Sequence, residues 1–166
     1  MAGSEELIPP SIFEPYLDSL LGIVGCLGPR LQFREVLNRV LSSLSTEMHF
    51  QRPHIVVQNP ENGSLHLSMT LGKPAVTHLT YAPGKGITGQ VFASGRPIIV
   101  DCMKNHPDFM NRLFDRSEEQ LASLAFLCVP VIAETSISSS SSSSGSTRTI
   151  VGTLSADTGM ATPEVL

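Results

Sequence analysis

Three glycines stand close together in the segment G-K-G-I-T-G, residues 84–89. They fit the G-x-G-x-x-G spacing that lets a backbone approach a pyrophosphate. No acidic residue follows at the distance that a dinucleotide site needs, and the phosphate-loop pattern G-x-x-x-x-G-K-[ST] is absent. The segment is better explained as a strand-to-helix turn, where positive φ and close backbone approach require glycine. A helix beginning near Ile87 could still present backbone amides to an anion.

Histidines and charged residues offer a second set of reactive side chains. His54, His66 and His78 are 12 residues apart and could meet across neighbouring strands as metal ligands. No H-x-x-x-H or H-E-x-x-H pattern supports that idea, so solvent-facing positions on strands explain them better. The charged run from Asp115 to Glu119 is interpreted as a solvated face.

The three cysteines, Cys26, Cys102 and Cys128, are widely spaced and odd in number, which indicates reduced thiols in a cytoplasmic protein. Cys128 lies in an apolar run and is predicted to be a small core residue. Cys102 follows Asp101 at a predicted strand end, where a redox role has no resolving cysteine nearby. No motif identifies a cofactor.

Composition limits the class of protein. The chain has 166 residues, a net charge of −4 and only 16% charged residues, which suits one domain and excludes a basic surface for nucleic acid. The N-terminus lacks the pattern of a signal peptide, and no apolar run reaches the ~18 residues of a membrane span. We expect a soluble, cytoplasmic protein that touches neither nucleic acid nor membrane.

Periodicity predicts the elements that position these residues. A loose leader (1–10) precedes an N-terminal helix (11–28), and an apolar stripe predicts a second helix over about 31–48. Alternating or β-branched runs predict strands near 53–58, 64–71, 76–81, 98–100, 126–132 and 150–154. A short helix over 87–95 and a loop with small helices over 104–124 are inserted between strands. The serine-rich stretch 136–147 predicts a flexible hairpin loop, and residues 158–166 the start of a C-terminal helix.

These elements make an α+β fold, one antiparallel sheet with helices on its faces. Loops inserted over a sheet are where ligand pockets form. Polar and aromatic residues gather at the predicted strand ends and in the inserted segment, namely Tyr81, Asp101, His106, Phe109, Arg112 and Thr153. The residues alone therefore predict a binding module without naming its ligand.

Four segments in order resemble the GAF domain family. They are YAPGKGITGQVFASGRPIIV (81–100), HPDFMNR (106–112), FLCVPV (126–131) and VGTLSAD (151–157). The resemblance covers residues 31–157. The sequences of these segments are most similar to the sensory domains of nitrogenase-specific regulators, which are activators that work with an alternative sigma factor. It implies a six-stranded antiparallel sheet with helices on both faces and a pocket between the sheet and the inserted helices.

The resemblance also implies a site and partners. It carries ligand binding onto nine positions: Tyr81, Ile87, Phe92, Asp101, Phe109, Arg112, Phe126, Cys128 and Thr153. It implies a response to 2-oxoglutarate or to a PII-type signalling protein, homodimers formed through the end helices, and control of an ATPase domain outside this chain. A carboxylate ligand would need an arginine fork, for which Arg112 and then Arg96 are the candidates.

Two other functions stay open. Some members of the family are free-methionine-sulfoxide reductases with cysteines in the glycine loop and the inserted segment, where this chain has Thr88, Met110 and Asn111. An enzyme of that kind would have to use Cys102 and Cys128, so we expect no enzyme activity. A dimerisation module with its pocket filled by side chains is the other alternative. The cysteine pair that precedes the domain in iron–sulfur relatives is absent.

Overall fold

A computed structural model describes residues 33–74, 78–137 and 145–159 of the chain. It divides into two compact units, up to His49 and from Phe50 onward, which we describe separately. The expected leader (1–10), the first helix (11–28), the start of a C-terminal helix near Pro163 and the serine run 138–144 lie outside the described residues.

The first unit contains helix α2 (Phe33–Thr46), which falls within the range that the apolar stripe predicts. Leu41 is completely buried, whereas Arg34, Glu35, Asn38 and Arg39 on the opposite side are exposed. The helix is therefore amphipathic, as its spacing of apolar residues requires.

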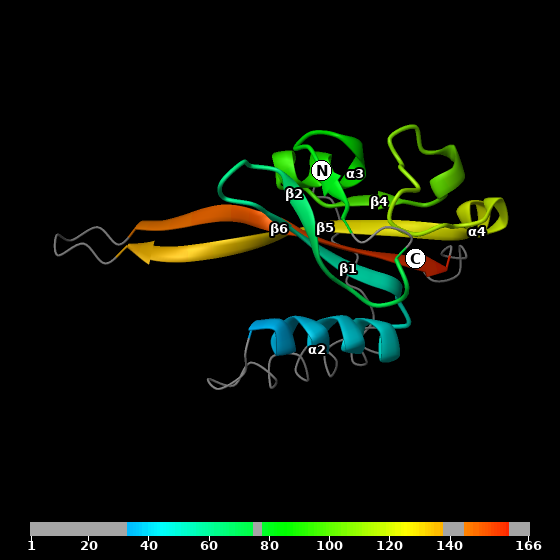
Figure 1. Ribbon diagram of the computed structural model, residues 1–166, viewed down its shortest axis with the longest axis horizontal. Helices are drawn as coiled ribbons and strands as arrows, with labels where there is room; N and C mark the ends of the chain where they lie inside the picture. Colours follow the sequence, from blue (N-terminus) through cyan, green and yellow to red (C-terminus); the bar gives the residue numbers. More distant parts are fainter. Residues whose placement is uncertain (1–32, 75–77, 138–144, 160–166) are drawn as a thin grey trace, which may run out of the picture. The chain divides into compact units, whose positions relative to one another are not determined.

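The second unit contains one six-stranded antiparallel sheet in the order β3-β2-β1-β6-β5-β4 (Figure 1). The strands are β1 (Gln51–Gln58), β2 (Leu65–Thr70), β3 (Thr80–Tyr81), β4 (Ile98–Val100), β5 (Leu124–Ile137) and β6 (Gly145–Gly159). The predicted α+β architecture with six antiparallel strands is confirmed.

Strands β5 and β6 are much longer than the sequence predicts. They continue as a two-stranded ribbon beyond the other strands (Figure 1), paired as far as Ile137 and Gly145. Threonine and isoleucine favour extended backbone, which accounts for pairing at both ends of the stretch 136–147 that we expected to be loop. Strand β6 also runs to Gly159, over the first two residues of the segment assigned to a C-terminal helix.

Helix α3 (Gly86–Ser94) follows β3 through the glycine turn and packs against β5 and β6. Gly84 and Gly86 have positive φ, and Gly95 ends the helix in the left-handed conformation at φ 67°. A Cβ on Gly89 would lie 2.4 Å from the Ala82 carbonyl oxygen. Glycine is thus required for conformation and close approach, which confirms the interpretation as a turn.

The inserted segment between β4 and β5 carries the turn η1 (Met103–Asn105) and helix α4 (Glu118–Ser123). Ser117 begins α4 with a capping box: its hydroxyl accepts from the Gln120 amide, and the Gln120 side chain accepts from the Ser117 amide. Two apolar clusters lie under this segment and α3, one around Val91, Met103 and Phe126 and the other around Val56, Leu65 and Phe114.

Gly152 provides a test of the central strand pairing. It sits between Val57 and Val131, and a Cβ there would lie 2.2 Å from the Val56 carbonyl oxygen. We predict that Gly152→Ala lowers the free energy of unfolding by roughly 3 kcal/mol, because the backbones of β1 and β6 must separate. Urea unfolding measures this. Gly159→Ala, whose Cβ meets nothing within 4 Å, is the matched control, and equal losses in both variants would contradict the register.

Candidate ligand cavity

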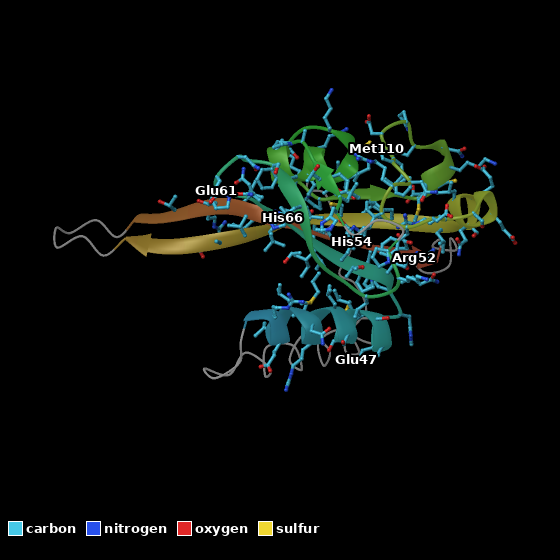
Figure 2. All side chains as sticks on the ribbon, in the orientation of Figure 1. Glu47, Arg52, His54, Glu61, His66 and Met110 are labelled. Carbon is cyan, nitrogen blue, oxygen red and sulfur yellow. The ribbon has the colours of Figure 1, made fainter. Side chains whose placement is uncertain are left out.

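A small cavity lies between the sheet, α3 and the inserted segment. Its volume is about 20 Å³, room for about one water molecule. The sheet contributes His54, Tyr81 and Phe126, and α3 contributes Ile87 and Thr88. The inserted segment supplies the remaining wall: Phe109, Met110, Leu113 and Arg116. Figure 2 shows His54 on β1 and Met110 on the inserted segment.

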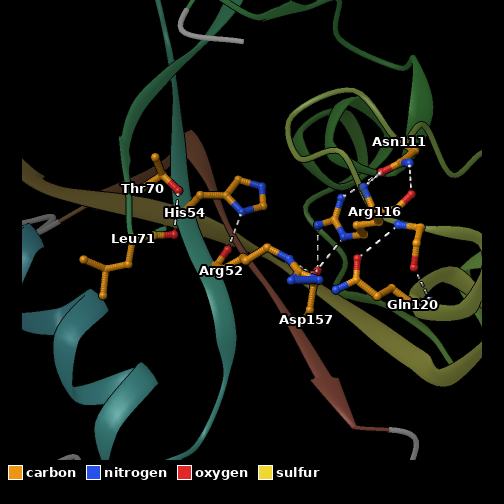
Figure 3. Close-up of polar contacts among 9 residues, drawn as sticks. Arg52, His54, Thr70, Leu71, Asn111, Arg116, Gln120 and Asp157 are labelled. Atoms are coloured by element: carbon orange, nitrogen blue, oxygen red, sulfur yellow. Dashed lines mark hydrogen bonds and ion pairs between the residues drawn. The ribbon is translucent and has the colours of Figure 1, made fainter. Parts of the chain in front are cut away.

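His54 is the buried polar group of the sheet wall, with 2% of its surface exposed. Burial lowers the pKa of its imidazole to about 4, although the hydrogen bond to the Arg52 carbonyl opposes this. The ring is therefore neutral near pH 6.5 and above. Nδ1 lies 3.0 Å from that carbonyl oxygen and must donate to it (Figure 3), so Nε2 carries no proton and is an acceptor.

Arg116 forms the opposite polar wall and is held by Asp157 on β6. Its Nε and Nη2 each donate to the Asp157 carboxylate over 2.8 Å, a bidentate pair in which both side chains are at most 2% exposed (Figure 3). Asn111 accepts from Arg116 Nη1 over 3.3 Å and donates to the Arg116 carbonyl over 2.9 Å. The guanidinium also lies 5.1 Å from the ring centre of Phe114 and 5.5 Å from that of Phe109. Arg116 is therefore committed to the protein.

A bulge in β1 brings a second arginine to the same carboxylate. The register with β6 shifts between Gln51 and His54, and Arg52 has a positive φ of 50°. Its Nε donates to Asp157 Oδ2 over 2.9 Å, while its carbonyl accepts from His54. One strained residue thus fixes both Asp157 and the His54 ring.

The polar atoms facing the cavity are largely unpaired. Among the described residues, the Thr88 and Tyr81 hydroxyls and His54 Nε2 make no hydrogen bond. Burial raises the pKa of Tyr81 to about 12, so its hydroxyl stays protonated and can donate. A small polar ligand that offers a donor to His54 and an acceptor to Tyr81 would satisfy these groups.

Cys128 lies in the core near the cavity but does not line it. Burial raises the pKa of its thiol to about 11, and the nearby Ser155 and Thr153 hydroxyls oppose this. Neither hydroxyl makes a hydrogen bond of ordinary geometry, so burial dominates. The thiol is protonated at neutral pH, as suits the predicted core cysteine.

The structure brings four of the nine predicted site residues together at the cavity: Tyr81, Ile87, Phe109 and Phe126. Of the others, Phe92 packs against the neighbouring apolar cluster, and Cys128 and Thr153 are buried outside the lining. Asp101 and Arg112 are exposed, although the Arg112 guanidinium lies 5.9 Å from the centre of the Tyr81 ring.

Two interpretations of polar residues were wrong. His54 is buried rather than solvent-facing, and Arg116 is 5% exposed although the run 115–119 was interpreted as a solvated face. Arg116 is buried because it pairs with the distant Asp157, whereas the His54 ring is buried between Phe114 and Phe126 and bonds locally to the Arg52 carbonyl. Sequence reasoning also left out Thr88, Met110 and Leu113, although the motifs that were singled out contain or adjoin them. Among the described residues, no group of three histidine, cysteine or acidic side chains could hold a metal ion.

The sequence profile described as GAF domain matches residues 32–163. The nitrogen fixation protein VnfA of Azotobacter vinelandii is 28% identical over 125 residues, which cover 74% of this chain and 22% of that protein. The Nif-specific regulatory protein of Azospirillum brasilense is 30% identical over 101 residues, 59% of this chain and 16% of that protein. This chain therefore spans about a fifth of the length of these curated relatives.

Solved structures share the fold. The GAF domain of A. aeolicus nlh2 in an inactive state superposes with a TM-score of 0.70 at 19% identity, covering 92% of this chain and 85% of that one. Free methionine-R-sulfoxide reductase from Neisseria meningitidis, in complex with its substrate, gives a TM-score of 0.66 at 20% identity, covering 90% of this chain and 78% of that one.

In the part of this chain that the structure describes, no helix is long and apolar enough to cross a membrane.

The buried His54 predicts a loss of stability in acid. Its pKa is about 4 when folded and 6.5 when unfolded, so the unfolded chain binds the extra proton between these values. The contribution is complete above pH 6.5 and falls by about 3 kcal/mol as the pH drops to about 4. Urea unfolding across this range measures it. His54→Gln should flatten the pH dependence, whereas His78→Gln, at an exposed position, should keep it. The same slope in both variants would contradict the assignment.

Removing the Asp157 charge tests the buried network. Asp157→Asn leaves Arg116 and Arg52 without their shared anion, so we expect a loss of about 3 kcal/mol in the free energy of unfolding. Glu118→Gln, which breaks the exposed 3.2 Å pair with Lys104, should cost less than about 1 kcal/mol. Chemical unfolding of both variants at neutral pH gives the comparison. If Asp157→Asn lowered the free energy of unfolding no more than Glu118→Gln does, the pairing of Asp157 with Arg116 and Arg52 would not be a main source of stability.

Proposed function

Because this chain belongs to the GAF domain family, we propose that it is the sensory domain of a nitrogen-fixation transcription activator. The relationship to VnfA and to Nif-specific regulatory proteins, at 28–30% identity, supports this function. In this proposal the domain acts in the cytoplasm, binds a small metabolite or a PII-type signalling protein, and controls an ATPase domain outside this chain.

The observation that carries the proposal is the cavity with unpaired polar atoms. His54 Nε2 and the Thr88 hydroxyl have no hydrogen-bond partner among the described residues and belong to side chains that line a water-sized cavity, so a bound water or ligand group can pair with them. The family places its ligand between the sheet and the inserted helices, where this cavity lies. With room for about one water molecule, the cavity must widen to admit a metabolite. The exposed Met110 and the half-buried Phe109 are the lining side chains that we expect to move, because Leu113 and Arg116 are buried.

Signal transfer would use β6 and the chain ends. Arg116 lines the cavity and is bonded to Asp157, two residues before β6 ends at Gly159. A ligand that displaces the inserted segment would therefore shift the last residues of this strand through the Arg116–Asp157 pair. We place the output in the end segments, 11–28 and 158–166, and the dimer contacts in the same segments. The ligand acts by binding the two arrangements with different affinity.

A catalytic alternative, reduction of free methionine sulfoxide, is less well supported. Such chemistry needs a thiolate, and the pKa of about 11 keeps the Cys128 thiol protonated. The other candidate thiol is that of Cys102, whose Sγ lies 3.8 Å from the carbonyl oxygens of Leu121 and Ala122. Thiol-dependent turnover of free methionine sulfoxide that vanished in Cys102→Ala would favour the enzyme over the sensor.

Calorimetry with 2-oxoglutarate tests the sensor. Arg112 lies beside the cavity-lining Tyr81 and, among the described residues, makes no ion pair, so it is the candidate for a ligand carboxylate. We expect saturable heat in the millimolar range and a loss of about tenfold in affinity for Arg112→Gln. Arg96, the second candidate from the sequence, is also exposed, but only Arg112 lies against the ring of the cavity-lining Tyr81. Arg96→Gln therefore separates the two candidates, and we expect it to bind normally.

A folded protein that gives no heat with 2-oxoglutarate would remove this metabolite from the proposal. The same titration with a PII-type protein then decides between a protein-sensing domain and the third alternative, a dimerisation module whose pocket is filled by side chains. For that module, light scattering should show a dimer that neither addition changes.

A further inference from the structure

An open cleft of about 730 Å³ has Arg52 and Phe114 among its lining residues, and neither of them lines the small cavity. Its walls are the turn after β2, with Gly72 and Lys73, and the segment from Phe114 to Gln120. This volume is in the usual range for small-molecule sites and far exceeds that of the cavity. The cleft shares only Arg52 and its contacts with the site described above, so it is a separate candidate.

Arg52 gives the cleft an incompletely used cation. Only its Nε is bonded, to Asp157, while its Nη2 is buried and has no hydrogen-bond partner. Its Nη1 makes no hydrogen bond with the described residues, and the side chain is 20% exposed. Because Nη2 is closed off from solvent, Nη1 is the donor that a ligand in the cleft can reach, and it is free to bind an oxyanion.

The charge around this arginine favours an anion. Arg52 and Arg116 share a single carboxylate, so the buried group has a net charge of +1 with His54 neutral. At the rim, Lys73 makes no ion pair among the described residues and adds a second cation, which Asp115 opposes. Gln120 offers an amide, and the ring of Phe114, 5.9 Å from the Arg52 guanidinium, gives an apolar floor.

Gly72 keeps the approach open. Its φ of +91° disfavours any other residue, and a Cβ there would lie 3.7 Å from Arg52 Cγ and 3.9 Å from the Phe114 ring. A larger side chain would therefore cover the arginine. The left-handed turn at 72 and the left-handed residue at 52 together leave the guanidinium reachable from the cleft.

We propose that this cleft is a second ligand site, which binds a small molecule through a carboxylate or phosphate group held by Arg52 and Lys73. Binding is felt at the cavity, because Arg52 also fixes Asp157 through its Nε and His54 through its carbonyl. The site does not depend on which ligand occupies the cavity.

Nuclear magnetic resonance titration of the whole ¹⁵N-labelled chain tests the proposal. Sodium succinate and sodium phosphate are added separately at constant ionic strength, and the signals of Gly72, Lys73, the Gln120 side-chain amide and Arg52 Nε are followed. We expect saturable shifts with a Kd of about 1–10 mM. Saturation with succinate alone identifies a carboxylate ligand, with phosphate alone a phosphate ligand, and with both a general oxyanion site.

Matched variants exclude a general charge effect. Lys73→Gln should weaken binding by about three- to tenfold, whereas Lys85→Gln removes the same charge from an exposed loop outside the cleft and should not change the affinity. Arg112→Gln, which impairs the cavity, should also leave this titration unchanged. Absence of saturation with both anions, or equal weakening by Lys73→Gln and Lys85→Gln, would overturn the proposal.

Discussion

The carboxylate of Asp157 is the group on which the rest of the site depends. It is fully buried, and it accepts hydrogen bonds from Arg116 and from Arg52, side chains that reach it from the inserted segment and from the edge of a β-bulge. Two cations that share one anion would be costly in an apolar interior if the carboxylate were lost. The geometry of the sheet end and of the inserted segment is thus set by one ion cluster.

Two hollows of different chemistry adjoin this cluster. The small cavity presents neutral polar atoms of His54, Thr88 and Tyr81, because Arg116 is fully engaged with Asp157 and Asn111. The open cleft instead adjoins Arg52, whose Nη1 makes no hydrogen bond with the described residues. We infer a division between a cavity for polar ligand groups and a cleft for an anion. Since Arg52 also fixes the orientation of the His54 ring, a ligand bound at either site would change the affinity of the other site for its ligand.

The fold was largely predictable from the sequence, and the polar site was not. Local patterns predict α2, α3 and the β1–β2 hairpin because periodicity and glycines at turns act over a few residues. The Arg116–Asp157 and Arg52–Asp157 pairs join residues 41 and 105 positions apart. Nothing near Arg116 in the sequence distinguishes it from its charged neighbours. His54 was misjudged for the same reason, since its burial follows from elements that pack over β1.

The state of the His54 imidazole tests the central claim most directly, because its tautomer follows from the Arg52 carbonyl and its charge from burial beside Arg116. A long-range ¹H–¹⁵N spectrum at neutral pH resolves both ring nitrogens. We predict a neutral ring with the proton on Nδ1 and with Nε2 bare, the acceptor that faces the cavity. A ring protonated on both nitrogens, or on Nε2 alone, would contradict the account, because the cavity would then offer a donor where we require an acceptor.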